Sequence, residues 1–457
     1  MTILTYVFAF LFAVGLLVAV HEYGHYWMAR RLGFKVLRFS VGFGKPLLRR
    51  VAGADRTEYV LGSLPLGGYV KMLDEREGPI PEHEVHRSYN RRPPLHRIAV
   101  LTAGPAANFL FAIAAFWLIF LVGMPGLRPF VGAAEAGSPA AVAGLQEEDL
   151  IVAVDGNEVQ TWEGALLAIY RTVLDDGEVP LTVQRAGASG REFVVLRPTA
   201  SLRELTRPGE LLPGLGLNVW FPDVPPIIGE VPSDGPAARA GLSPGDRIVA
   251  VGDARVETWS DFVDQVRPFP GRSTSFAVTR ADGSEAVLDI TLGEQVEGEQ
   301  RVGYAGVAAA PLPRETIDQL WSEQRFGPVT AARNAAAKTW EMTSLTLDLF
   351  RRMLFGQVSM ENLSGPINIA VYAGDTFRSG FVDFVRFLAL VSVSLGLINL
   401  MPVPMLDGGQ IVFTAIEGVR GSPLSDRVQL LGQQVGIFAV LALMTLALYN
   451  DLSRLIG

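Results

Sequence analysis

The sequence contains no cysteine among its 457 residues and only five histidines. Disulfides, thiolate nucleophiles and cysteine-based zinc sites are therefore excluded, so any bound metal must use His, Asp or Glu. Charged residues are scarce at 19%, whereas hydrophobic residues make up 49%, and both values depart from those of a soluble enzyme. The net charge of -8 comes without a basic cluster, which argues against nucleic acid as a partner. Part of the chain is expected in a lipid bilayer.

Four apolar stretches approach or reach the roughly 20 residues that a membrane-spanning helix needs. They are Ile3–Val20, Ile98–Val122, Phe381–Met401 and Leu430–Tyr449. The first leads into His21 and Glu22 rather than a cleavage site, so we expect a retained helix and not a signal peptide. An excess of Arg and Lys between the first two spans assigns that segment to the cytoplasm. Both termini and the segment between the second and third spans are then extracytoplasmic, which in a bacterial inner membrane means periplasmic.

One pattern occurs twice in this extracytoplasmic segment. The tripeptide AGL, at residues 143–145 and again at 240–242, is followed each time by Asp, Ile, Val and a Thr-Trp pair at the same spacings. The copies lie about 97 residues apart, which is the size of a small domain. Short apolar stretches between Gly and Asp turns favour β-strands in each copy. We expect two tandem β-rich domains at residues 127–220 and 222–311.

The second copy, AGLSPGDRI at residues 240–248, resembles PDZ domains of the bacterial, circularly permuted kind. The first copy has Glu148 in place of Gly245, so its turn must form without the tolerance of glycine for positive φ. The resemblance implies that a peptide adds a strand to a sheet edge, with its carboxylate held by backbone N–H groups. The corresponding loops are residues 215–217 and, in the second copy, Ala305, Gly306 and Val307. A purely structural spacer is the alternative.

The strongest chemical signal is the sequence HEYGH at residues 21–25, which we expect at the end of the first apolar helix. His21 and His25 are four residues apart, so they share one face of a helix and can bind one metal ion. Glu22 lies beside that face, where a carboxylate can act as general base toward water and return the proton to the leaving amine. Ionisable groups at membrane depth are costly, which favours a functional role. A pair of interfacial, hydrogen-bonding histidines is the alternative.

A catalytic zinc ion takes three protein ligands and leaves a fourth position open. No suitable third ligand follows His25 closely, so it must come from elsewhere in the chain. The stretch NLMPVPMLDGG at residues 399–409 offers Asp407 directly after the third span, where prolines break the helix and glycines permit close approach of the backbone. We expect Asp407 to be the third ligand, with a capping Asp in a loop as the alternative. His83, His86 and His96 lie in a polar loop and are assigned no site.

These residues resemble the site-2 protease family of intramembrane metalloproteases, over essentially the whole chain. Besides the motifs above, the resemblance covers GFG at 42–44, LGGYVKM at 66–72 and AGPAANF at 103–109. It implies zinc held by His21, His25 and Asp407, with Glu22 as the base and Asn399 near the substrate or the developing oxyanion. It also implies regulated intramembrane proteolysis: a single-span substrate, typically an anti-sigma factor, is first shortened outside the membrane and then cut within it.

Between the first two spans, Val36–Val41 and Glu58–Leu61 are expected to form a β-hairpin that dips into the membrane, where protein must cover its backbone. The resemblance implies that an edge of this hairpin receives the substrate as an added strand, so Gly42 and Gly44 are expected to help position it. Edge pairing would hold the substrate unwound, because a helix shields its own carbonyls. A cytoplasmic hairpin without substrate contact is the alternative.

The expected architecture is a polytopic α-helical membrane protein with about four spans, a membrane-associated β-hairpin and two PDZ-like domains. The protease core occupies residues 1–122 and 381–457, and an amphipathic region at 312–380 joins it to the repeats. Residues 331–355 have the pattern of an amphipathic helix that lies on the outer membrane interface or packs against the repeats. Two rivals are a non-catalytic PDZ scaffold and a metal transporter. The transporter would need polar residues spread through several spans.

Overall fold

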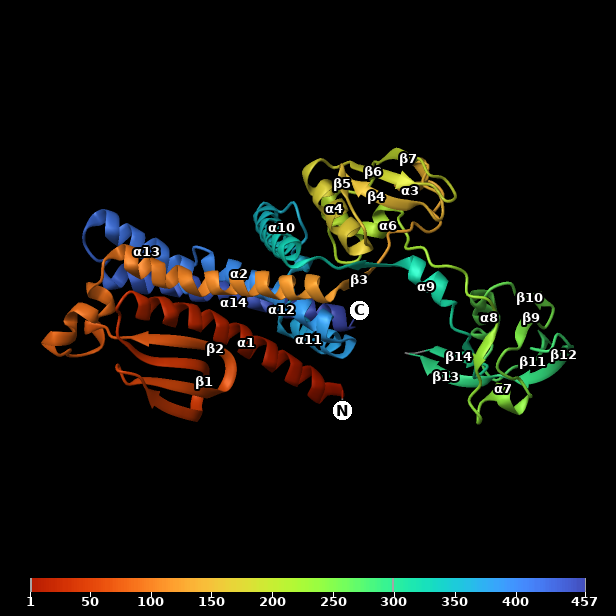
Figure 1. Cartoon of the computed structure of the whole chain (residues 1–457), viewed down its shortest axis with the longest axis horizontal. Helices are drawn as coiled ribbons and strands as arrows, with labels where there is room; N and C mark the ends of the chain where they lie inside the picture. The colour runs from red at the N-terminus through yellow and green to blue at the C-terminus, as the bar shows by residue number, and fades with distance from the viewer. Residues whose placement is uncertain (1, 298–299, 457) are drawn as a thin grey trace.

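The computed structural model describes residues 2–297 and 300–456 and consists of a bundle of long helices, a small sheet and two β-rich domains (Figure 1). Within these residues four helices are long and apolar enough to cross a membrane, as predicted. They are α1 (Thr2–Arg31), α2 (Pro94–Val122), α12 (Phe381–Leu400) and α14 (Asp426–Ile456). The position of HEYGH at a helix end was wrong, because α1 continues without a break through Arg31. Its polar side chains therefore lie inside a continuous helix.

Buried alanines allow the spans to pack closely. One hydrophobic cluster joins α2 to α12 and to α10 (Pro328–Leu354) through residues such as Ala112, Ala335 and Ala389. A second cluster joins α1 to α12 and to α11 (Pro366–Ser379). Small side chains at such crossings bring helix backbones within van der Waals reach, which is the main source of helix association in lipid. Because α12 contributes to both clusters, it links α1 to α2.

A buried carboxylate holds the C-terminal helix α14 against the start of α11. Asp451 is 1% exposed and accepts hydrogen bonds from the backbone N–H groups of Gly365, Ile367 and Asn368, at 2.8, 3.0 and 3.1 Å. An anionic acceptor at a helix N-terminus satisfies donors that have no partner inside the helix and interacts favourably with the helix dipole. This contact fastens a span to a helix more than eighty residues earlier in the chain.

The sheet between α1 and α2 is built from two long strands, β1 (Val36–Ala52) and β2 (Thr57–Met72). Both strands bend, so that residues 38–41 of β1 pair with residues 58–61 of β2 on one side and with residues 68–71 on the other. Residues 38–41 therefore lie inside the sheet, and residues 64–72 form an edge. Arg38 donates to Glu58 at 2.5 Å, and this hydrogen bond lowers the pKa of the Glu58 carboxyl below its usual value. The ion pair joins two neighbouring segments of the sheet.

Three short 3-10 helices lead from the sheet into α2, and another precedes α11. They are η1 (Glu75–Glu77), η2 (Glu82–Arg87), η3 (Tyr89–Arg91) and η4 (Met360–Asn362).

The two β-rich domains have separate hydrophobic cores, drawn from residues 131–217 and 228–305. Their four-stranded sheets have the same order, β5-β4-β6-β7 and β10-β9-β11-β12. The first domain contains β4 (Leu150–Val154), β5 (Asn157–Glu158), β6 (Val179–Gln184), β7 (Arg191–Leu196), α3 (Pro139–Val142), α4 (Trp162–Asp175), α5 (Leu202–Leu205) and α6 (Leu211–Leu215). The second contains β8 (Ile228–Glu230), β9 (Arg247–Val251), β10 (Ala254–Arg255), β11 (Ser273–Thr279), β12 (Glu285–Thr291), β13 (Gly293–Glu297), β14 (Gln300–Tyr304), β15 (Ala308–Ala309), α7 (Pro236–Arg239) and α8 (Trp259–Val266).

The same ion pair recurs inside both domains. Arg185 contacts Asp149 at 2.5 Å, and Arg280 contacts Asp246 at 2.6 Å; each carboxylate is 1% exposed. The turn before this Asp is left-handed in both domains, with φ of +66° at Glu148 and +90° at Gly245. The first domain thus keeps a backbone that favours glycine although it has no glycine there.

The domains differ in their attachment to the helices. Arg171 of α4 donates to Ser344 of α10 at 2.8 Å, and Arg352 of α10 donates to Asp175 of α4 at 2.8 Å. Leu174 and Met353 share a hydrophobic cluster between the same helices. The predicted amphipathic helix therefore packs on the first domain as well as on α2 and α12. In Figure 1 the second domain lies away from the bundle, beyond α9 (Arg314–Leu320).

A two-stranded ribbon closes the base of this extramembrane segment. β3 (Met124–Leu127) follows α2 directly and pairs antiparallel with β16 (Trp321–Gln324), which leads into α10. Leu127 lies opposite Trp321. The chain therefore leaves the helix bundle and returns to it at one place.

Candidate metal centre

Two histidines and a carboxylate from opposite ends of the chain converge at one point. The Nε2 atoms of His21 and His25 lie 3.1 Å apart, and Oδ2 of Asp407 lies 3.1 and 3.3 Å from them. One ligand atom from each residue lies within 4.8 Å of the others. Both histidines are 8% exposed. The structure thus brings together the three residues that the sequence singled out as ligands.

A break between two helices delivers Asp407. α12 ends at Leu400, and α13 (Asp407–Arg420) begins with Asp407 itself. Two glycines make the intervening turn possible, because an added Cβ would lie 2.2 Å from Leu400 O at Gly408 and 2.2 Å from Val403 O at Gly409. Any larger residue at either position would clash with the main chain. The DGG sequence is therefore required by the turn as well as by the carboxylate.

The donor set fits a zinc ion. Oδ2 of Asp407 is buried and has no hydrogen-bond partner of suitable geometry among the described residues, although two imidazole nitrogens face it. Two neutral imidazole nitrogens and one carboxylate oxygen are a usual ligand set of catalytic zinc, which keeps a further position for substrate or water. Without a metal, the buried carboxylate would need a protonated histidine to compensate its charge, whereas a zinc ion compensates the charge and binds both imidazoles. The geometry therefore favours a metal.

Glu22 lies beside the edge segment of the sheet, next in sequence to the proposed ligand His21. It is 8% exposed on α1, one residue after His21. A Cβ added at Gly68, in the edge segment of β2, would lie 2.7 Å from Cγ of Glu22 and 2.6 Å from Ser40 O. The edge of the sheet thus approaches the side chain of the expected base, and the close approach requires glycine at position 68.

Helix α2 supports both histidines from behind. Nδ1 of His25 contacts Val100 O at 2.8 Å, and Nδ1 of His21 contacts the amide of Asn108 at 3.2 Å. Between them, a Cβ at Gly104 would lie 2.2 Å from Nε2 of His25. The AGPAANF motif contains Gly104 and Asn108, but this role was not predicted from the sequence. The spacing of Val100, Gly104 and Asn108, four residues apart like the two histidines, was the available signal.

The other expected site residues do not join this cluster of donor atoms. Asn399 lies in the last turn of α12 and is partly buried. Gly42 and Gly44 form the bend within β1, with φ of +90° and +86°, and a Cβ at Gly42 would lie 2.9 Å from Leu64 O. The loop of Ala305, Gly306 and Val307 belongs to the second β-rich domain, where Ala305 O accepts from Ala237 N at 2.9 Å.

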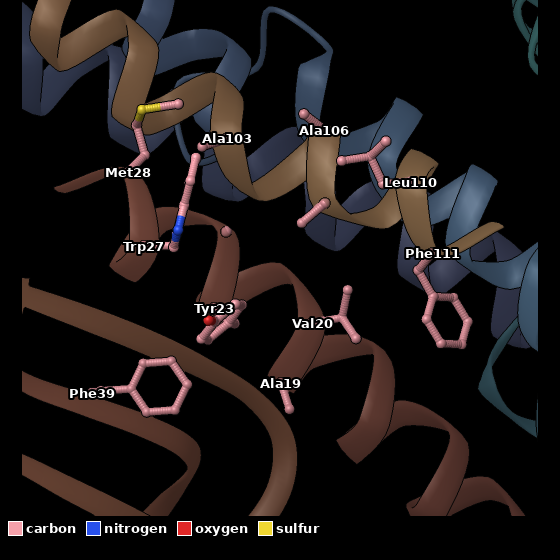
Figure 2. Close-up of a pocket in the computed structure, with 12 residues that line it drawn as sticks. Ala19, Val20, Tyr23, Trp27, Met28, Phe39, Ala103, Ala106, Leu110 and Phe111 are labelled. Atoms are coloured by element: carbon pink, nitrogen blue, oxygen red, sulfur yellow. The ribbon is translucent and has the colours of Figure 1, made fainter. Parts of the chain in front are cut away.

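An apolar groove of about 870 Å³ lies on another face of α1 and α2 (Figure 2). Its walls include Val20, Tyr23 and Trp27 of α1, Leu110 of α2 and Phe39 of β1. Tyr23 and Trp27 are about half exposed, at 56% and 51%. The groove contains none of the three ligand residues, and its lining suits hydrocarbon rather than the chemistry of the metal centre.

A pair of histidines and a glutamate on an apolar helix, together with a carboxylate that follows the break after another apolar helix, define a membrane-spanning zinc metalloprotease. The chain belongs to peptidase family M50, whose model matches residues 9–443. It is 40% identical to protease RseP of Yersinia pestis over all of both chains. It is also 40% identical to regulator of sigma-E protease RseP of Escherichia coli strain K12 and 38% identical to a candidate zinc metalloprotease of Vibrio cholerae, over 98% of each chain. The predicted site-2 protease family and the use of zinc are thereby confirmed.

Proposed function

We propose that this enzyme performs regulated intramembrane proteolysis of a single-span membrane protein of the anti-sigma-factor type, after a first cut outside the membrane. The observation that carries the proposal is the position of His21 and His25 inside α1, a helix apolar enough to span the bilayer. The substrate class is supported by relatives named regulator of sigma-E protease. The enzyme then belongs in a bacterial inner membrane, with the β-rich, PDZ-like domains in the periplasm.

Each residue of the centre has a separate role in this proposal. His21, His25 and Asp407 hold zinc, which when bound polarises the scissile carbonyl and makes water a better nucleophile. Glu22 takes the proton from the attacking water and passes it to the leaving amine. Asn399, in the last turn of α12 before the bend that leads to Asp407, positions the substrate or donates to the developing oxyanion.

The substrate is proposed to add a strand to the sheet at residues 64–72. The sequence predicted this function for an edge of the hairpin of Val36–Val41 and Glu58–Leu61, but residues 38–41 and 58–61 are each paired on both sides and have no free edge. The segment 64–72 is an edge, and Gly68 within it approaches Glu22. Strand addition would keep the substrate backbone extended, so its carbonyl is accessible to the metal and the base. Gly42 and Gly44 contribute by shaping the bend beside this edge.

The roles of base and ligand separate in one experiment. Glu22→Gln should keep bound zinc but lose cleavage of a transmembrane reporter, because it removes the base and no ligand. Asp407→Ala and His25→Ala should lose both zinc and cleavage. Metal analysis of the purified proteins alongside the cleavage assay measures these outcomes. Cleavage by Glu22→Gln at the wild-type rate would refute the role of Glu22 as the general base.

Proline substitution tests the edge. Tyr69 and Val70 are neighbours in the edge segment, so their N–H groups point to opposite sides of the strand. Of the variants Tyr69→Pro and Val70→Pro, one removes an N–H that faces away from β1. That variant should keep its zinc content but stop cleavage, because it loses only a donor available to the substrate. The other should disrupt pairing with β1, as should the interior control Ser40→Pro. Full cleavage by both edge variants would make the sheet a purely structural element.

A further inference from the structure

We propose that Asn108 is a positioning residue that fixes His21 in the one tautomer able to bind zinc. The inference rests on the proposed zinc centre. Helix α2 carries Val100, Gly104 and Asn108, which follow one another at intervals of four and so share a face. That face lies against the two histidines of α1, which have the same spacing. Each histidine therefore meets its own partner on α2.

His25 has a partner that can only accept a hydrogen bond. Its Nδ1 lies 2.8 Å from the backbone carbonyl oxygen of Val100. The proton of the neutral imidazole is therefore held on Nδ1, and Nε2 keeps the free lone pair that a metal requires. No side chain is needed for this choice, so substitution of Val100 would not disturb it.

His21 has a partner that can act in either way. The amide of Asn108 is fully buried, with its nitrogen 3.2 Å from Nδ1 of His21, and its Oδ1 has no hydrogen-bond partner among the described residues. If the amide nitrogen donates to Nδ1, the histidine proton is on Nε2 and blocks the metal position. A half-turn of the amide exchanges nitrogen and oxygen in nearly the same space. Oδ1 then accepts from Nδ1, and Nε2 is free.

Only one of these two orientations is compatible with a bound metal. Either orientation leaves one amide atom unpartnered, so hydrogen-bond counting alone does not select one. Zinc can bind only when Nε2 of both histidines is unprotonated. With zinc present, Asn108 must therefore offer Oδ1 to His21. Ser392 of α12 also donates to the backbone oxygen of Asn108 at 2.9 Å, which fastens this residue to the helix that precedes Asp407.

Zinc affinity of three variants tests the proposal. The measurement is competition with a chromophoric chelator, on full-length protein purified in detergent. Asn108→Leu keeps the size of the side chain but removes the acceptor, and we expect about a 10- to 100-fold loss of zinc affinity. Asn108→Asp supplies acceptors only and should bind zinc at least as tightly as the wild type. Ser392→Ala, which removes the link to α12 but keeps the amide, should bind zinc normally.

Two results would overturn the role of Asn108. Wild-type affinity in Asn108→Leu would show that His21 needs no acceptor, and equal losses in Asn108→Leu and Asn108→Asp would show that the site needs the amide nitrogen or its shape. A Leu variant that fails to fold still leaves the Asp variant decisive, because a donor role for Asn108 predicts zinc loss there. His21→Ala separates failure of the wider proposal: if it retains zinc, the metal centre itself is wrong.

Discussion

The two β-rich domains have the same internal construction but different neighbours. Each has the same strand order and the same buried Arg–Asp pair. Helix α4 of the first domain continues to Asp175, whereas its counterpart α8 ends at Val266, before Pro268 and Pro270. The residues that dock the first domain on α10 lie in the extra length of α4.

The residues that make each domain fold therefore differ from the residues that attach the first domain to α10. The repeated residues build the core and the turns, and they do so equally in both copies. Attachment depends on a few residues outside the pattern, and two prolines remove them in the second copy because proline cannot continue a helix. We infer that the first domain is a fixed cover above the helix bundle, while the second is an arm that depends on its own core.

Deletion of the domains should have the largest effect. Because Leu127 lies opposite Trp321, residues 128–320 can be replaced by a two-residue Asn-Gly turn. We expect this variant to cut substrates that retain a folded extracytoplasmic domain, since the fixed cover is gone. A variant that lacks only residues 222–311 should still reject substrates with a folded extracytoplasmic domain. Cleavage of paired reporters, with and without such a domain, measures the difference.

The opposite pattern would reverse the comparison. If loss of the second domain alone admits untrimmed substrates, the arm is the filter. If both deletions instead slow the cleavage of trimmed substrates, the domains capture the substrate through a groove such as the Ala305 to Val307 loop.

The second largest effect is expected from Met353→Ala, which should weaken the attachment of the first domain to α10. Met353 is 7% exposed in the cluster between α10 and α4, and truncation of such a buried side chain costs about 2–5 kcal/mol. Hydrogen exchange should become faster in α4 and remain unchanged in α8. Leu347, which lies on α10 and is 55% exposed, provides the control Leu347→Ala. Equal effects on both domains would mean that the second domain also depends on α10.

Because the two domains share the buried Arg–Asp pair, removal of its carboxylate should lower the stability of each domain by a similar amount. Asp149→Ala and Asp246→Ala each remove a buried carboxylate that accepts from an Arg and from a backbone N–H. Each should destabilise its own domain by about 1–3 kcal/mol and leave the other unaffected. Local unfolding by hydrogen exchange measures both, with the exposed Asp289→Ala as control. A loss confined to one domain would contradict equal construction.

The smallest effect concerns the left-handed turn. Glu148 has φ of +66°, which costs a non-glycine residue about 1–2 kcal/mol. Glu148→Gly should therefore stabilise the first domain by about 1 kcal/mol, after allowance for the greater freedom of glycine when unfolded. The reciprocal Gly245→Ala should destabilise the second. If Glu148→Gly lowers stability, the side chain of Glu148 contributes a contact that outweighs the strain.

Much of the fold followed from local chemistry. Hydropathy predicted the four long apolar helices, because length and composition suffice for that decision. The sheet was harder: the alternation of residues 36–41 predicts a strand but not whether it lies inside a sheet or at its edge. Here bends in both long strands turned an expected hairpin edge into an interior segment. Hydropathy also gave too short a first helix, because it detects only the apolar residues up to Val20, whereas α1 continues through the polar HEYGH residues to Arg31.

The proposed ligand set could be predicted because few residues could form it. Without cysteine and with five histidines, a pair four residues apart and a carboxylate after a proline-rich break were the main candidates. Asn108 was not predicted, since its contact with His21 depends on how α1 crosses α2. The arrangement of sheet edge and base also depends on a close approach, at Gly68, that spacing in the sequence does not reveal.

The ribbon of β3 and β16 has a consequence for chain entropy. Its pairing holds Leu127 opposite Trp321, so the ends of a very long connection between α2 and α10 stay together whatever lies between them. For the helix bundle, the entropy cost of closing this connection is similar to that of a tight turn, because the loop is already closed at the ribbon. Lengthening or exchanging the β-rich domains should then cost the membrane-embedded part little. An insertion closed in this way can change its selectivity for substrates while the ligands of the metal stay in place.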